Sequence, residues 1–197
     1  MYFKSQTMNS ISGIIRARRA YFPKMYSGLP VTEEEIHEIL ENAHWAPTHK
    51  RTEPWRFKIF HSLESRKRLA DFIAADFKSN TPADKFSEVK MNEAAEKPLQ
   101  SACTIAICMQ RDPLASVPEW EEIAAVSCAV QNMWLTCTAL HIGSYWASPG
   151  FINRLDPVLK LNEGERCLGL FYLGKLKEGS FAPALRNPIE EKIMWMA

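Results

Sequence analysis

The chain has 197 residues, of which 46% are hydrophobic and 24% charged, the composition of a globular protein with a sizeable core. Lys and Arg total 24 against 23 Asp and Glu, so the formal net charge is only +1. A charge so close to zero provides no general attraction to nucleic acids or to anionic membranes. Any anion that the protein binds must therefore be held by a local group of cationic side chains.

The sequence carries no sign of export or of a membrane span. No stretch approaches the run of about 20 apolar residues that crosses a bilayer, and residues 1–13 lack the apolar core of a signal peptide. The five cysteines are odd in number and form no Cys-x-x-Cys pair, which favours free thiols in a reducing compartment. We expect a cytoplasmic protein whose residues 1–197 form a single domain.

Helix signals dominate the first part of the chain. A helix is expected over residues 10–19, with isoleucines along one face. Thr32 has the position of an N-cap and Glu35 that of its capping-box partner. The helix that they begin should end before Pro47, since a residue that precedes proline disfavours helical geometry.

Strands and helices mix in the middle of the chain. Residues 56–60 are predicted to form a strand, after which Ser62 should cap another helix. The polar segment 79–97 is expected to hold a loop followed by a charged helix. It could act as a lid or be a plain solvated connection. Residues 104–109 form a compact apolar run that is typical of a buried strand.

A long apolar helix is the main feature of the last part. It should run from just after Pro118 to about Leu140, and its apolar surface requires either a central position or a subunit interface. Residues 143–147 and 167–174 are predicted strands, and the tail 188–197 ends in apolar side chains that suit a partner surface. Because helices and strands do not alternate strictly, we expect an α+β fold with a central mixed or antiparallel sheet packed by helices.

Familiar catalytic motifs are missing from the sequence. There is no Gly-x-Gly-x-x-Gly turn, no Walker-type phosphate loop and no His-Glu-x-x-His metal motif. The Ser148 segment does not match the Gly-x-Ser-x-Gly of a hydrolase. We therefore identify no catalytic side chain and no metal ligands.

Three local features could bind a ligand, and each has a simpler interpretation. The basic run at 16–19 could hold phosphate, or it could only complement the dipole at a helix C-terminus. The segment 45–57 carries His49 and Lys50 in a proline-bracketed turn, although a histidine in a loop is more often a surface residue. The glycine-containing, aromatic stretch 141–150 could present backbone amides to a flat heterocycle, or could be a helix end followed by a strand.

Taken in order, these features resemble the nitroreductase family of FMN enzymes, in particular its short single-domain branch. The segments that carry the resemblance are Arg-Arg-Ala at 18–20, Ala-Pro-Thr-His-Lys at 46–50, Glu-Pro-Trp-Arg-Phe at 53–57, Gly-Ser-Tyr-Trp-Ala-Ser-Pro-Gly at 143–150, Gly-Leu-Phe-Tyr-Leu-Gly at 169–174 and Arg-Asn-Pro-Ile-Glu-Glu at 186–191. No single segment is specific, but their common order along residues 10–191 is.

The resemblance implies a homodimer in which FMN lies between the subunits and takes electrons from NADH or NADPH. The positions that match FMN contacts are Arg18, Arg19, Ala20, Trp45, His49, Lys50, Trp146, Ala147, Ser148 and Arg186. The three arginines would hold the phosphate, and the 146–148 segment would line the flavin ring with backbone groups. His49 and Lys50, from the same or the second subunit, would lie beside the ring or the ribityl chain.

The implied reaction is a ping-pong transfer of hydride from the nicotinamide to a small acceptor such as a nitroaromatic compound or a quinone. Three departures from the family pattern oppose tight FMN binding: Ala20 replaces a serine, Glu53 a glutamine and Ala147 a basic residue. These departures leave open an alternative, a non-catalytic flavin-binding protein or a structural dimer on the same fold.

Overall fold

The structure is a computed structural model that describes residues 10–180, 182 and 185–196. The expectation about a leader at the N-terminus therefore lies largely outside the described residues. Within the described ranges, no helix combines the length and the apolar character that crossing a bilayer requires.

The described residues form a central antiparallel sheet in the order β1-β2-β4-β3. The strands are β1 (Trp55–Phe60), β2 (Cys103–Gln110), β3 (Ile142–Ala147) and β4 (Glu165–Lys175). β2 is buried along nearly its whole length, as its apolar run predicts. β3 is an edge strand, and its Tyr145 lies opposite Tyr172 of β4. This arrangement confirms the predicted α+β fold.

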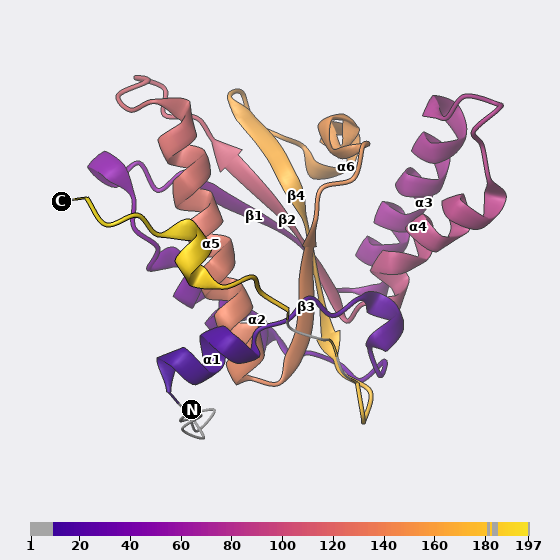
Figure 1. The fold of residues 1–197 in the computed structure, drawn as a ribbon. Helices are drawn as coiled ribbons and strands as arrows, with labels where there is room; N and C mark the ends of the chain where they lie inside the picture. The colour runs from indigo at the N-terminus through magenta and orange to yellow at the C-terminus, as the bar shows by residue number, and fades with distance from the viewer. Residues whose placement is uncertain (1–9, 181, 183–184, 197) are drawn as a thin grey trace.

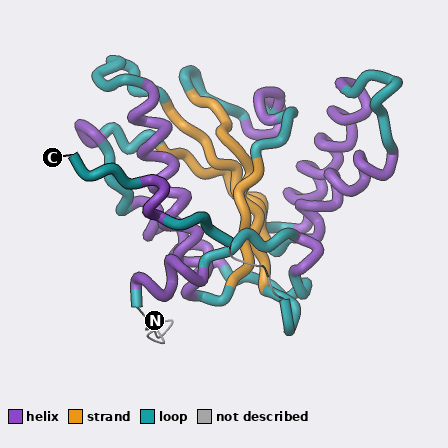
Figure 2. Tube along the Cα trace, in the orientation of Figure 1, coloured by secondary structure: helices purple, strands orange, loops and turns teal. Residues whose placement is uncertain are grey.

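Helices cover both faces of the sheet, as Figures 1 and 2 show. One layer holds α1 (Ile11–Ala17), α2 (Glu33–His44) and α5 (Glu119–Ala139), and the other holds α3 (Leu63–Asn80), α4 (Glu88–Gln100) and α6 (Asp156–Leu159). Because successive strand residues point to opposite faces, Ile105 and Ile107 pack in the core on the α5 side while Ala106 and Cys108 pack on the α3 side.

The helix caps that the sequence predicts are present. The Thr32 side chain accepts a hydrogen bond from the Glu35 amide, and the Glu35 carboxylate accepts one from the Thr32 amide. Ser62 caps α3 by accepting a hydrogen bond from the Ser65 amide. Both helices therefore begin where local polar side chains satisfy free backbone amides.

One predicted boundary needs correction. α1 ends at Ala17 and not at residue 19, because Arg18 has extended backbone angles that direct the chain toward β3. The 79–97 segment holds a loop followed by a charged helix, as expected: α3 ends at Asn80, and α4 begins after its N-cap Ser87. The cysteines are free thiols as expected, with Cys128 of α5 exposed and the other four buried.

Candidate functional site

Arg18, Arg19 and Arg186 lie close together where α1 ends. Burial, followed by repulsion from Arg186 and Arg19, lowers the pKa of Arg18. Arg19 donates to the carbonyl oxygens of Arg16, Arg18 and Ala182. Among the described residues, no carboxylate forms an ion pair with any of the three arginines. Such an uncompensated cationic group can bind an anion, and guanidinium groups suit phosphate because they donate two parallel hydrogen bonds.

The segment after the arginines is fixed to the edge of the sheet. The Trp134 indole nitrogen on α5 donates to the Arg19 carbonyl at 3.0 Å and to the Ser144 carbonyl at 3.1 Å. The Tyr21 amide donates to the same Ser144 carbonyl at 3.1 Å. Ala20, which lies between these contacts, packs partly buried against the core on the α3 side. The arginine group is thus held beside β3 by hydrogen bonds of its own segment.

The predicted 146–148 segment occupies the end of β3. Trp146 and Ala147 are half-buried and Ser148, just past the strand, is exposed. The Trp146 indole N–H is buried and has no acceptor among the described residues. Gly169 of β4 makes room for the ring, since a Cβ there would lie 2.1 Å from Trp146 Nε1. The segment therefore joins the arginine group at one edge of the sheet.

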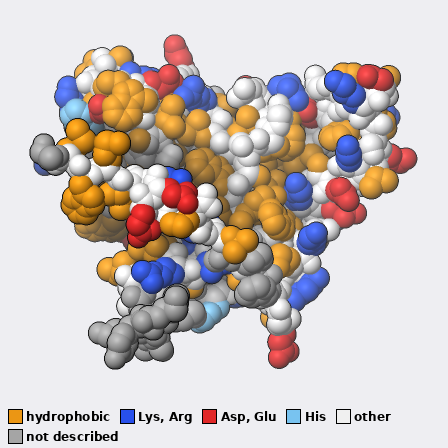
Figure 3. Space-filling model, viewed as in Figure 1, with side chains coloured by type: hydrophobic (Ala, Val, Ile, Leu, Met, Phe, Trp, Pro, Cys, Tyr) orange, Lys and Arg blue, Asp and Glu red, His pale blue; other side chains and the backbone are white. Residues whose placement is uncertain are grey.

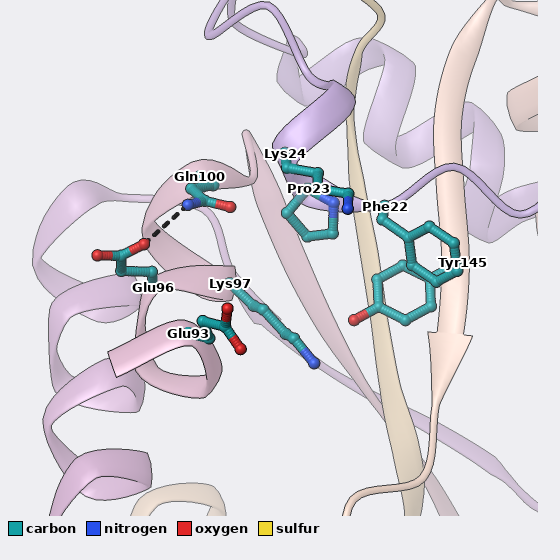
Figure 4. Close-up of a pocket in the computed structure, with 8 residues that line it drawn as sticks. All are labelled: Phe22, Pro23, Lys24, Glu93, Glu96, Lys97, Gln100 and Tyr145. Atoms are coloured by element: carbon teal, nitrogen blue, oxygen red, sulfur yellow. Dashed lines mark hydrogen bonds between the residues drawn. The ribbon is translucent and has the colours of Figure 1, made fainter. Parts of the chain in front are cut away.

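A cavity of about 510 Å³ opens between α4 and β3, a volume typical of small-molecule sites. Figure 4 shows the residues that line it: Phe22, Pro23, Lys24, Glu93, Glu96, Lys97, Gln100 and Tyr145. Phe22 and Lys24 follow Arg18 and Arg19 by a few residues, so the chain leads from the anion site to one wall of the cavity. Figure 3 shows a hollow between the two helical layers in which hydrophobic side chains gather.

The sequence interpretation missed the residues of this cavity. Glu93, Glu96, Lys97 and Gln100 occur at helical spacing, which places them on one face of α4. That spacing was the available signal, but it does not indicate which face of the helix turns toward the sheet. Tyr145 carries no local signal of a site, because the family resemblance of its segment depends on the neighbouring Trp146.

Tyr145 holds the most unusual polar atom of the cavity. Its side chain is only 7% exposed, and its hydroxyl has no hydrogen-bond partner among the described residues. Burial raises the pKa of Tyr145 to about 12. A buried hydroxyl without a partner costs about 1–3 kcal/mol, so this group is available to donate a hydrogen bond to an acceptor other than the described residues.

The remaining predicted residues lie elsewhere in the protomer. Trp45 ends α2 with its ring 78% exposed, and its indole nitrogen donates to Glu41. His49 pairs with Glu121 at 2.5 Å, and Lys50 donates to the Ser116 carbonyl at 2.8 Å. These contacts place the 49–50 segment at the N-terminal end of α5.

The arginine group lies toward the other end of that helix, where Arg18 contacts Trp134. At about 1.5 Å per residue, the α5 positions Glu121 and Trp134 are about 20 Å apart along the helix axis. Within one protomer the structure therefore does not bring His49 and Lys50 to the arginines. The backbone of the 49–51 turn is strained, with positive φ at Lys50 and Arg51. Such strain is common in loops that carry function.

Comparisons with known proteins point to one family. The family model described as "Nitroreductase family" matches residues 15–175. The curated "Putative NAD(P)H nitroreductase YfhC" of Bacillus subtilis is 27% identical over 93% of this chain and 92% of its own length. The "Putative NAD(P)H nitroreductase YdjA" of Escherichia coli K12 is 26% identical over 73% of this chain and 76% of its own length.

Solved structures agree on the fold. The nitroreductase-like family protein from Bacillus cereus superimposes with a TM-score of 0.78 at 27% identity, covering 98% of this chain and 99% of its own. The structure described as a "putative nitroreductase in complex with fmn" from Desulfovibrio desulfuricans has a TM-score of 0.73 at 24% identity, covering 97% of this chain and 99% of its own.

Proposed function

This chain belongs to the nitroreductase family, and we propose that it is an FMN-dependent oxidoreductase that passes electrons from NADH or NADPH to small acceptors. The observation that carries the proposal is the group of Arg18, Arg19 and Arg186 beside β3. It is cationic and has no carboxylate partner among the described residues, and the chain leads from it within a few residues to Phe22, Pro23 and Lys24 on the wall of a cavity of suitable volume. FMN has one anionic end and one flat heterocyclic end, which match these two parts.

The residues present fit such a cofactor. The arginines would hold its phosphate, and Trp146, Ala147 and Ser148 would lie along the ring at the end of β3. Ala20 provides no hydroxyl for the phosphate, but the third guanidinium offsets that loss because it adds two possible donors. The hydrophobic and aromatic lining from Phe22 and Tyr145 suits a planar ring.

A homodimer would complete the site. His49 and Lys50 lie about 20 Å along α5 from the arginines of their own protomer, so they would contact the cofactor held by the partner subunit. Large apolar side chains of the tail are available for such an interface: Leu185, Ile189, Ile193, Met194, Trp195 and Met196 are all exposed. In the view of Figure 1 this tail crosses in front of α5. An exposed apolar surface of this kind is typical of an interface between chains.

When bound, FMN supplies the hydride and electron transfer, while the protein supplies position and electrostatics. Cationic groups near the ring favour its reduced, more negative form. The donor would leave before a nitroaromatic compound or a quinone binds in its place, a ping-pong order. Reduction of a quinone to its hydroquinone would take one hydride equivalent from NADH or NADPH and one proton, and that proton can come from solvent, so the chain needs no dedicated acid.

The proposal is tested by loading the purified protein with FMN under anaerobic conditions and adding NADH or NADPH. We expect the visible flavin absorption to bleach with one of the two donors and to return when a quinone or a nitroaromatic compound is added. Protein that binds FMN but is never reduced would contradict the enzymatic function and indicate a non-catalytic flavin-binding protein.

A further inference from the structure

The hydroxyl of Tyr145 is a donor that the proposed function leaves unassigned. The side chain is more than nine-tenths buried, lines the cavity between α4 and β3, and finds no acceptor among the described residues. In Figure 4 its oxygen is directed away from β3 toward α4, on the side where the Lys97 ammonium lies. The hydroxyl therefore faces the side of the cavity that Lys97 also lines.

The neighbouring Tyr26 is in a different situation. Tyr26, equally buried, donates from its hydroxyl toward the carbonyl oxygens of Tyr21 at 2.8 Å and Tyr172 at 3.2 Å. The same cluster thus satisfies one buried hydroxyl and leaves that of Tyr145 unpaired. Buried polar groups in proteins nearly always have a hydrogen-bond partner, which can be protein, water or a ligand.

The ring of Tyr145 is held firmly by its neighbours. It stacks on Tyr172 with centroids 5.2 Å apart, and Phe22 packs edge-on against it at 5.0 Å. These contacts fix the direction in which the hydroxyl points, so a ligand would meet a preorganised donor. Since burial raises the pKa of Tyr145 to about 12, the hydroxyl keeps its proton at neutral pH and can donate it in a hydrogen bond to an acceptor.

A second donor borders the same space. Lys97 forms no ion pair with any carboxylate of the described chain, although Glu93 and Glu96 also line the cavity, and Glu96 accepts a hydrogen bond from Gln100. A neutral hydroxyl and an ammonium on the wall of one cavity can both donate hydrogen bonds. They therefore suit a ligand that presents carbonyl oxygens along one edge and becomes more negative there.

We propose that Tyr145 donates a hydrogen bond, together with Lys97, to the carbonyl-bearing edge of the flavin ring and so stabilises the reduced form of the cofactor. This inference rests on the proposed function, because it assumes that FMN occupies the site. It makes Tyr145 a cofactor-binding residue that tunes the reduction potential. Lys97 contributes the positive charge, and the aromatic neighbours only orient the donor.

The test compares the variant Tyr145→Phe with Tyr172→Phe, a control that removes the hydroxyl of the stacked neighbour outside the cavity lining. For each protein one measures FMN affinity in both redox states, the midpoint potential, and the thermal stability of the apoprotein. Tyr145→Phe should bind reduced FMN about tenfold more weakly relative to oxidised FMN, which lowers the two-electron potential by about 30 mV. The apoprotein should be at least as stable as the wild type, because the lost hydroxyl has no partner. Tyr172→Phe should keep the wild-type potential.

The opposite results are equally clear. If Tyr145→Phe keeps the wild-type potential and affinities, or loses apoprotein stability without any change in potential, the hydroxyl has only a structural role and the inference is wrong. Lys97→Met provides a second variant, which should lower the potential by at least as much. A wild-type protein that does not bind FMN would overturn the proposed function itself, whereas FMN binding with an unchanged Tyr145→Phe potential overturns this inference alone.

Discussion

The guanidinium carbon of Arg18 lies 4.5 Å from the centroid of the Trp134 ring. Arg18, the C-cap of α1, thus stacks on a side chain of α5. The indole nitrogen of Trp134 donates hydrogen bonds to the carbonyl oxygens of both Arg19 and Ser144 of β3. One tryptophan thus orients a cation with its ring face and fixes the following backbone with its nitrogen. This relationship places the arginine group at the edge of the sheet before any ligand binds.

Arg18→Ala should weaken FMN binding ten- to hundredfold, because hydrogen bonds to charged groups contribute about 1.5–3 kcal/mol. The free energy of unfolding should change by no more than about 1 kcal/mol, the contribution of a partly exposed cation–π contact. Fluorescence titration and urea unfolding measure the two effects. Arg16→Ala is the matched control: it removes an exposed arginine of the same helix and should leave affinity unchanged. Unaltered FMN affinity in Arg18→Ala would show that this arginine does not hold the phosphate.

Mixed dimers test whether the site is shared between subunits. A variant lacking Arg18 and Arg19 and a variant lacking His49 and Lys50 should each have little activity alone. When their chains are mixed and exchanged, roughly a quarter of all sites should regain every residue, since half of the dimers of a symmetric pair are mixed and each has one intact site. NAD(P)H oxidation by the exchanged mixture measures the recovery. Activity that stays at the level of the separate variants would mean that both residue pairs act within one protomer.

Gly169→Ala should disturb the contact between β4 and Trp146. A Cβ at this position would lie 2.1 Å from Trp146 Nε1 and 2.7 Å from the Ala147 carbonyl oxygen. We expect a loss of about 1–3 kcal/mol in the free energy of unfolding, as for other overpacked core sites, together with weaker FMN binding. Urea unfolding of Gly150→Ala provides the control, because nothing lies within 4 Å of a Cβ there. Equal stabilities of the two variants would show that the Trp146 ring moves aside freely.

The buried carboxylate of Glu165 should make stability depend on pH. Burial alone would raise its pKa, but hydrogen bonds from Asn162 and the ammonium of Lys58, 3.0 Å away, outweigh that effect and lower the pKa. Its stabilising contribution is therefore complete above the pKa of an unfolded glutamate, about 4.3, and is lost as the pH falls through the lower value of the folded protein.

Glu165→Gln should accordingly lose about 1.5–3 kcal/mol of unfolding free energy at pH 7, the range for hydrogen bonds to charged groups. The difference from the wild type should shrink as the pH is lowered below 4. Urea unfolding at both pH values measures it, with the exposed Glu163→Gln as the control. A difference that grows on acidification would contradict the sign of this argument.

Local signals in the sequence predicted much of the fold. The Thr32 cap, the Ser62 cap and the apolar run of β2 all depend on nearest neighbours along the chain, and the structure confirms each of them. The end of α1 was predicted two residues too late because Arg18 has good helical propensity. Its extended conformation depends on contacts with Trp134, a residue far away in the sequence.

The candidate site was predictable only in part for the same reason. The arginines stand next to one another in the sequence, and their grouping with Arg186 followed from a family resemblance. The cavity brings together Phe22, Lys97 and Tyr145, which belong to three distant segments. No local pattern indicates that α4 faces the edge strand across this cavity, so these residues required the tertiary structure.

The most direct test of the account is a comparison of FMN and riboflavin binding by the purified wild-type apoprotein. The two ligands share the ring and differ in the phosphate, which we assign to Arg18, Arg19 and Arg186. The account predicts that FMN binds at least about tenfold more tightly than riboflavin, from one charge-assisted contact or more, and that added salt reduces the preference. Equal affinities for the two ligands, or no binding of either, would contradict the proposal that this arginine group holds a flavin phosphate.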